Sequence, residues 1–150
     1  MQTEIQHKWF YNQSPQEVWD YLTKPELMQQ WLMKNDFELI VGHDFQFRTN
    51  PIPDLNFDGI FYCKVLEIIP LKKLSYSWKC GPGNHELTLD SIVVWTLNVK
   101  YNGTELFLKH AGFKEIENFN MYTALKDGWL KNMQKIAELL KAAKHGAPNI

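Results

Sequence analysis

The chain has 150 residues, the size of one ordinary domain, with 16 basic and 17 acidic side chains and a formal net charge of -1. With 45% hydrophobic and 22% charged residues, its composition is that of a globular protein and not of a disordered one. The balanced charge predicts no basic surface for phosphate backbones, so nucleic acid is not an expected partner. Aromatic residues make up 14% and include six tryptophans, and such side chains dominate cores and line apolar pockets.

The two cysteines, Cys63 and Cys80, form no metal-ligand or redox motif. This pattern predicts neither a zinc site nor a disulfide framework, and it is typical of a cytoplasmic protein. Residues 1–8 include Glu4 and lack the apolar run of a signal peptide. No stretch approaches the roughly 20 apolar residues that span a bilayer. We therefore expect a cytoplasmic domain without membrane insertion, metal or cofactor.

The first elements are indicated by alternation and by a helix-start motif. Residues 5–11 alternate between two faces, which predicts a strand. Ser14-Pro15-Gln16-Glu17 then combines an N-cap serine, a proline at the first helical position and a glutamate three residues after the cap. After Pro25, residues 27–32 show helical spacing of apolar side chains. Two short helices are therefore expected after the first strand.

Alternation predicts six more antiparallel strands between residues 36 and 113. They are expected at 37–41, 44–48, 60–69, 74–79, 92–100 and 105–113. Asn102-Gly103 is the strongest hairpin signal, because a type I′ turn requires positive φ at both of its central positions. The longer loops at 49–58 and 81–90 are candidate rims of an opening.

The clearest element is a long amphipathic helix from about Asn118 to Ala143. Its apolar residues recur at steps of three and four: Phe119, Tyr122, Leu125, Trp129, Met133, Ile136 and Leu140. Gly128 in the middle of this helix predicts the close approach of another element beside Trp129. Residues 143–150 are expected to fray at the end of a single domain that spans residues 1–150.

This order of elements resembles the helix-grip architecture of the START and birch-pollen-allergen-like (SRPBCC) superfamily. The resemblance implies an α+β fold in which a curved, seven-stranded antiparallel sheet wraps around a long C-terminal helix, with two short helices after strand one.

Local motifs narrow the resemblance. They are Ser14-Pro15-x-Glu17-Val18-Trp19, Trp31, Gly59, Pro70 with Leu74-x-Tyr76-x-Trp78, Gly103-Thr104-Glu105-Leu106-x-Leu108-x-His110-x-Gly112-Phe113, and Gly128-Trp129. Together they look like the family named for activation of the heat-shock protein 90 ATPase. The eukaryotic activators carry a separate N-terminal domain for which 150 residues leave no room, so the resemblance is mainly one of fold.

Strand parity sorts the side chains of the sheet into two faces. On the last strand Leu106, Leu108 and His110 share the face opposite Glu105 and Lys109, so we expect the first three to face the helix. The same parity places further residues on the inner face: Ile5, His7, Trp9, Tyr11, Leu74, Tyr76, Trp78, Val93, Trp95, Leu97 and Val99. These aromatic rings either fill a core or line a cavity.

If the interior is a cavity, the resemblance implies a module that binds a small hydrophobic or amphipathic molecule between the sheet and the C-terminal helix. The candidate site residues are His7, Trp9, Tyr11, Tyr76, Trp78, Trp95, Leu108, His110 and Trp129. His110 is the expected polar anchor, with room beside its ring at Gly112. The alternative is a core histidine that bonds a backbone carbonyl or a Tyr or Trp partner, since an unpaired buried imidazole is costly.

Two other function classes stay open. Some relatives in the superfamily cyclise polyketides or process aromatic rings, which by analogy makes His7, Tyr11, Tyr76 and His110 candidate acids or bases. No nucleophile motif or metal-ligand spacing supports catalysis directly.

The third class is protein interaction. Phe10, Val94 and Phe107 face outward by parity, and an exposed apolar cluster of this kind predicts a homodimer or a chaperone partner. Cover by a loop or by the short helices is the alternative.

Overall fold

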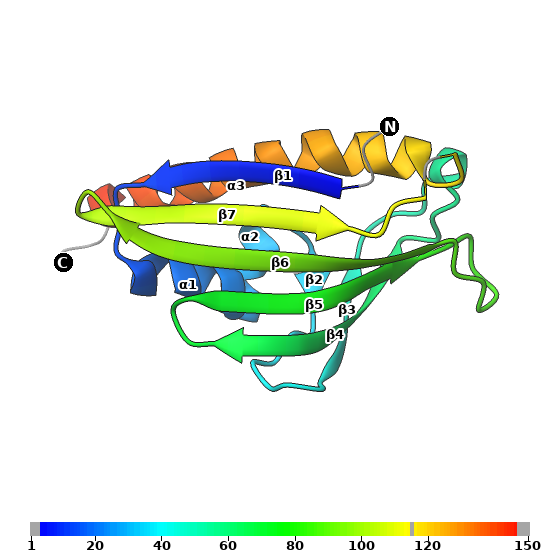
Figure 1. Cartoon of the computed structure of the whole chain (residues 1–150), viewed down its shortest axis with the longest axis horizontal. Helices are drawn as coiled ribbons and strands as arrows, with labels where there is room; N and C mark the ends of the chain where they lie inside the picture. The colour runs from blue at the N-terminus through cyan, green and yellow to red at the C-terminus, as the bar shows by residue number, and fades with distance from the viewer. Residues whose placement is uncertain (1–3, 115, 147–150) are drawn as a thin grey trace.

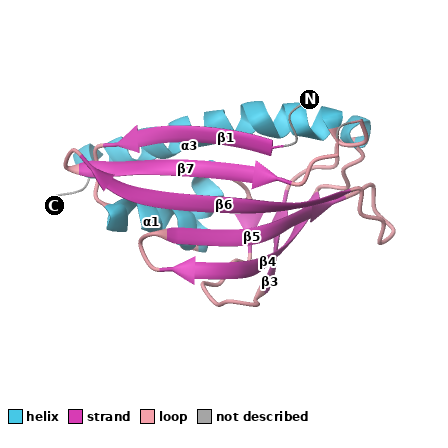
Figure 2. Cartoon of the chain, in the orientation of Figure 1, coloured by secondary structure: helices cyan, strands magenta, loops and turns pink. Residues whose placement is uncertain are grey.

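A computed structural model describes residues 4–114 and 116–146. Its elements are β1 Glu4–Tyr11, α1 Pro15–Thr23, α2 Pro25–Trp31, β2 Lys34–Asn35, β3 Asp44–Arg48, the 3-10 helix η1 Pro53–Leu55, β4 Ile60–Ile69, β5 Lys73–Cys80, β6 Leu89–Lys100, β7 Gly103–Ala111 and α3 Phe119–Gly146. The strands form one antiparallel sheet in the order β1-β7-β6-β5-β4-β3-β2. Figures 1 and 2 show α1, α2 and α3 on the same face of this curved sheet. The predicted helix-grip α+β fold is confirmed.

The start of α1 is fixed by the capping box that the sequence predicted. The Glu17 N–H donates to Ser14 Oγ at 3.2 Å, and the Ser14 N–H donates to Glu17 Oε1 at 3.0 Å. Trp31 at the end of α2 donates its indole N–H to Tyr21 O at 2.8 Å, which ties the two short helices together. The pair covers one end of the inner face of the sheet (Figure 1).

The bounds of β3 and β4 are those predicted, but the strand predicted at 37–41 is wrong. β2 is instead a two-residue strand just before this segment, and residues 36–43 form a loop. Asp36 holds the loop, because its Oδ1 accepts from the Gln46 N–H at 2.7 Å and its carbonyl bonds the His43 ring at 3.0 Å. Three apolar residues of the loop, Leu39, Ile40 and Val41, are between 42% and 60% exposed. These three side chains therefore do not pack on a buried face.

The hairpin between β6 and β7 forms one residue earlier than predicted. The positive φ angles belong to Tyr101 at 49° and Asn102 at 64°, while Gly103 pairs with Lys100 in the ladder. Gly103 has a packing role, because a Cβ there would lie 2.3 Å from Tyr11 O. The chain thus needs glycine at this position for the close approach of β1.

The long helix α3 follows the predicted apolar stripe. Trp129, Met133, Ile136 and Leu140 are buried against the inner face of the sheet. Residues 143–146, which were expected to fray, are helical, and 147–150 lie outside the described residues. The predicted close approach at Gly128 is wrong, because a Cβ there would meet no atom within 4 Å. Within the described residues, none of the helices is both long enough and apolar enough to cross a bilayer.

Candidate functional site

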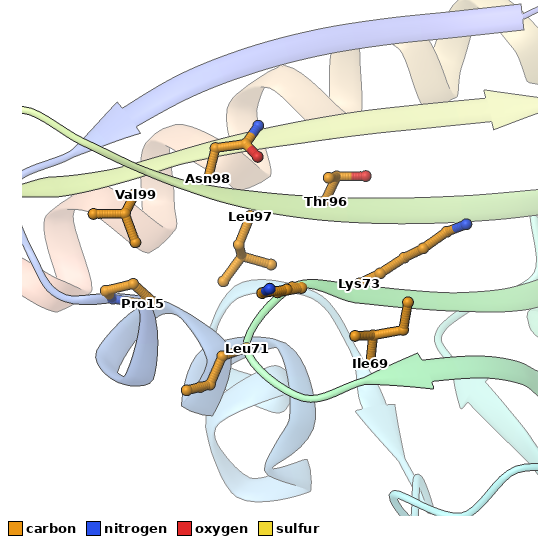
Figure 3. A pocket seen from close by; sticks show the side chains of 9 residues that line it. Pro15, Ile69, Leu71, Lys73, Thr96, Leu97, Asn98 and Val99 are labelled. Carbon is orange, nitrogen blue, oxygen red and sulfur yellow. The ribbon is translucent and has the colours of Figure 1, made fainter.

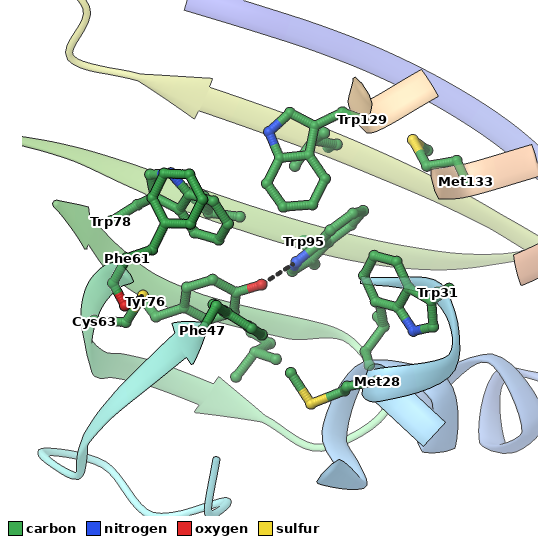
Figure 4. Packing of buried hydrophobic residues seen from close by; sticks show 14 of the residues in the cluster. Met28, Trp31, Phe47, Phe61, Cys63, Tyr76, Trp78, Trp95, Trp129 and Met133 are labelled. Carbon is green, nitrogen blue, oxygen red and sulfur yellow. Dashed lines mark hydrogen bonds between the residues drawn. The ribbon is translucent and has the colours of Figure 1, made fainter. Parts of the chain in front are cut away.

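Aromatic rings fill the space between the sheet and α3 (Figure 4). Trp78, Trp95 and Trp129 are each at most 1% exposed. The ring centroid of Trp129 lies 5.1 Å from that of Trp78 and 5.5 Å from that of Trp95, while Phe61 lies 4.3 Å from Trp78. These are the separations of aromatic rings in direct contact. The predicted interior residues Trp78, Trp95 and Trp129 are therefore brought together as a packed core and not around an open space.

His110 on β7 is fully buried, as strand parity predicted, and both of its ring nitrogens are bonded within the protein. Trp129 Nε1 donates to Nδ1 at 3.0 Å, and Nε2 lies 2.8 Å from Ser91 Oγ. The Ser91 hydroxyl itself donates to Trp78 O at 2.7 Å, so it accepts from the Nε2–H. This network assigns the neutral tautomer that carries its proton on Nε2. Burial lowers the pKa of His110 to about 3, which keeps the ring neutral at physiological pH.

The sequence left two alternatives for His110, a polar anchor for a ligand and a core histidine with a Tyr or Trp partner. The bond from Trp129 corresponds to the second alternative. The room expected beside the ring at Gly112 is absent. Gly112 has a φ of 118°, and a Cβ there would lie 2.8 Å from Asp90 O and 2.9 Å from the Cα of Ser91. Glycine at this position therefore allows close backbone packing and does not open a space.

The other candidate acids and bases bond separate partners. The Tyr76 hydroxyl accepts from Trp95 Nε1 at 2.9 Å, and the Tyr11 hydroxyl donates to a main-chain carbonyl of α3 at 2.8 Å. Burial raises the pKa of both phenols above their ordinary value, which disfavours their ionisation. His7 is half-buried, and its Nε2 lies 2.7 Å from another carbonyl of α3. These groups do not converge on one reaction space.

Possible metal ligands are also dispersed. In the described ranges no three His, Cys, Asp or Glu side chains gather closely enough to hold a metal ion. Cys63 and Cys80 are free and buried, and burial raises the pKa of both thiols. Such thiols behave as small apolar side chains of the core.

One polar atom of the interior lacks a partner. Among the described residues, Trp78 Nε1 is the only buried side-chain nitrogen or oxygen without a hydrogen bond. The indoles of Trp31, Trp95 and Trp129 each donate to an oxygen or nitrogen of the protein. An unpaired buried donor costs on the order of 1–3 kcal/mol. Trp78 therefore carries the interior polar group that is free to bond a ligand. The sequence had predicted this residue only as part of the aromatic lining.

Of the hollows in the described part of the chain, three bear on the candidate site. The largest has a volume of about 550 Å³ and lies between the turn after β4, the end of β6 and the start of α1 (Figure 3). A second, of about 390 Å³, lies between the end of β1 and α3 and is lined in part by Trp9, Tyr11 and Lys141. A third, of about 30 Å³, lies beside Cys80 and Met121. Two of the predicted site residues thus line a hollow between sheet and helix.

Comparison with known proteins agrees with this fold and these motifs. A family model described as Activator of Hsp90 ATPase homolog 1-like protein matches residues 12–141. The chain belongs to this family. The resemblance inferred from its motifs is thereby confirmed.

Solved structures include close matches to this family member. Protein MLL2253 from Mesorhizobium loti is 32% identical, with a TM-score of 0.81 over 92% of this chain and 96% of the other. The Aha1 dimer from Colwellia psychrerythraea (20% identity, TM-score 0.74, 93% and 96% covered) and CalU16 from Micromonospora echinospora (23%, 0.72, 91% and 73%) share the fold. No curated protein matches the chain significantly.

The outer face of the sheet in this family member carries the apolar cluster predicted from parity. Phe10 is 38% exposed, and Phe107 and Val94 are half-buried. Phe107 is a diagonal neighbour of Phe10 across β1 and β7, and Val94 is a diagonal neighbour of Phe107 across β7 and β6. Ile92, one row further along β6, is 45% exposed and extends the cluster. No helix of the described chain lies over this face (Figure 1), so the alternative of cover by the short helices is wrong.

Proposed function

We propose that this domain binds a small hydrophobic or amphipathic molecule between the sheet and α3, and that an acceptor atom of the molecule bonds the indole N–H of Trp78. The observation that supports this function is the unpaired donor at Trp78 in an interior whose other buried polar side-chain atoms are bonded, within the described residues. A molecule with one acceptor and an apolar body would satisfy the donor and match the rings around it. The domain acts in the cytoplasm, where its two buried thiols stay reduced.

Entry to this site is proposed at the end of the sheet that carries the small hollow. Cys80 and Leu89 form a cross-strand pair there, two residues along from the pair of Trp78 and Ser91 and on the same face of the sheet. Met121 of α3 covers the same hollow, whose volume of about 30 Å³ suffices for one water molecule. A larger guest must therefore displace side chains, and Met121 with its flexible thioether is the side chain that adapts most easily.

The start of α3 is held to the neighbouring loop by one side chain. Asn118 Nδ2 donates to Thr88 O at 2.8 Å, and Asn118 Oδ1 accepts from the Lys114 N–H at 2.7 Å. A small outward shift of this helix end widens the hollow toward Trp78. The candidate rim loops are bonded to each other through the Asp58 N–H and Gly81 O at 2.9 Å and are expected to move together.

A thermal-shift screen of fatty acids, sterols, flavonoids and aromatic acids tests this function. A ligand at 100 times its dissociation constant adds about 2.7 kcal/mol to the free energy of unfolding, which raises the Tm by roughly 5–10 °C. Trp78→Phe should weaken a ligand that carries an acceptor by about five- to tenfold, because it removes the donor and keeps an aromatic ring. Trp31→Phe, which removes an indole N–H bonded to Tyr21 O, is the matched control and should leave affinity unchanged. A panel without any stabiliser, or equal affinity in Trp78→Phe, would contradict the proposal.

A second candidate function is self-association through the outer face of the sheet. The exposed side chains of Ile92 and Phe10 support it, together with the relative that was solved as a dimer. Light scattering after gel filtration should then give twice the monomer mass, and Phe10→Glu should restore the monomer. If the wild-type protein is monomeric at high micromolar concentration, self-association is contradicted and the outer face is expected to bind a different partner, such as a chaperone.

A further inference from the structure

The largest hollow lies at the end of the sheet opposite the rim loops, away from the interior site (Figure 1, Figure 3). Its lining residues are Pro15, Ile69, Leu71, Lys72, Lys73, Thr96, Leu97, Asn98 and Val99. Leu97 is 4% exposed, whereas Val99, which parity had placed inside, is 76% exposed near the end of β6. A volume of about 550 Å³ with mainly apolar walls is the size and character of a small-molecule site.

Leu71 occupies a strained position at the edge of this hollow. The turn after β4 is closed by the Lys72 N–H, which donates to Ile69 O at 2.9 Å, and Leu71 adopts a φ of 66° at its third position. A turn with positive φ there normally takes glycine or asparagine, because a side chain on Cβ crowds the backbone. The other non-glycine residues with positive φ in the described ranges are asparagines, His85 and Tyr101. An aliphatic residue at such a position indicates a role for its side chain.

The charge around the hollow is positive. Lys73 is paired with Glu67, with Nζ 2.9 Å from Oε1. Lys72 has no carboxylate within 4.0 Å among the described residues, and no acidic side chain lines the hollow. An unpaired ammonium beside an apolar surface matches a molecule that has a negative head and an apolar body.

We propose that this hollow is a second binding site, which takes a small organic anion of the alkyl or aryl carboxylate class. The apolar body of the anion lies against Leu71, Leu97 and Val99, and its carboxylate pairs with Lys72. This site does not depend on the interior site, because the two lie at opposite ends of the sheet.

The probe for this site is sodium decanoate, titrated into the full-length ¹⁵N-labelled protein and followed by amide chemical shifts in NMR spectra. The amides of Lys72, Leu97 and Val99 should shift in a saturable way. Decyltrimethylammonium has the same chain length and the opposite charge, and it should bind at least about fivefold more weakly. Lys72→Gln should reduce decanoate affinity by about two- to fivefold and remove most of this preference. Equal affinities for the two amphiphiles in the wild-type protein would overturn the proposal.

Leu71→Gly separates binding from turn stability. Glycine adopts the required φ without strain but removes an apolar wall, so decanoate affinity should fall by about tenfold while the Tm stays within about 3 °C of wild type. Leu39→Gly, in a different exposed loop, is the matched control and should keep wild-type affinity. Trp78→Phe should also keep it, which distinguishes this site from the interior one. A Leu71→Gly variant that loses stability and still binds decanoate normally would assign the leucine to the turn alone.

Discussion

Replacement of His110 by phenylalanine should destabilise the fold, because the imidazole joins Trp129 to Ser91 in the core. The variant keeps a ring of similar size but loses two hydrogen bonds, each of about 1 kcal/mol. It also leaves the Trp129 N–H buried without an acceptor, at a further cost of roughly 1–3 kcal/mol. The hydroxyl of Ser91 keeps its bond to Trp78 O, so its loss of the His110 partner adds little further cost. We expect a total loss of about 3–5 kcal/mol, or a Tm lower by roughly 9–15 °C.

The same variant should change the pH dependence of stability. Burial lowers the pKa of His110 to about 3 in the folded protein, whereas the ordinary value of 6.5 applies to the unfolded chain. Between these two values the unfolded chain binds the extra proton, so wild-type stability falls as the pH falls below about 6.5 and is constant above it. From about pH 7.5 to pH 5, His110 alone should remove about 2 kcal/mol. His110→Phe lacks this contribution. The difference in free energy of unfolding between wild type and variant should therefore be about 2 kcal/mol smaller at pH 5 than at pH 7.5.

Urea unfolding at both pH values measures these differences, with His7→Phe as the control. His7 is half-buried and its single bond is to a carbonyl of α3, so its replacement should cost less than about 1 kcal/mol. The double variant His110→Phe/Trp129→Phe should cost at least about 1 kcal/mol less than the sum of the single variants, because it removes the orphaned donor together with its acceptor. Additive losses, or a deficit that does not change with pH, would refute the bonding assigned to His110.

Three further predictions concern single positions and are tested by the same unfolding measurements. Gly128→Ala should stabilise the protein by about 0.5–1 kcal/mol, because the new Cβ meets no atom within 4 Å and alanine favours the helix interior. Trp129→Ala should lose about 3–5 kcal/mol, and a loss below about 1 kcal/mol would place Trp129 outside the core. Gly103→Ala should lose about 1–3 kcal/mol, because its Cβ would lie 2.3 Å from Tyr11 O.

The sequence predicts this fold well where one face of an element is buried. The bounds of β3 and β4 and the capping box at Ser14 follow from alternation and from local hydrogen bonding. Prediction fails at 37–41, where Asp36 holds a loop in which Phe37 is buried and the apolar residues 39–41 are exposed. It also fails at Gly128, because a helix tolerates a glycine that contacts nothing. In both cases the local pattern is present without the packing that normally causes it.

The candidate site was less predictable, because its hydrogen bonds cross between distant elements. Parity placed His110 on the inner face, but its direct cross-strand partners there are the apolar Ile5 and Val93. Its bonds go to Ser91, a diagonal neighbour on β6, and to Trp129 on α3. No spacing in the sequence encodes such a diagonal and interlayer set. The polar partners of an inward histidine follow from register and helix rotation together.

The unpaired donor on Trp78 is informative because the indoles of Trp31, Trp95 and Trp129 are each paired within the protein. Trp95 donates to the Tyr76 hydroxyl and Trp129 to His110, so the chain supplies acceptors beside these two rings. Trp78 uses its carbonyl to accept from Ser91 but has no acceptor for its own N–H in the described residues. A phenylalanine would fill much of the same space without the cost of a buried donor. That cost is recovered only when an acceptor enters the interior, and for this reason the expected guest carries an oxygen or nitrogen atom and is not a pure hydrocarbon.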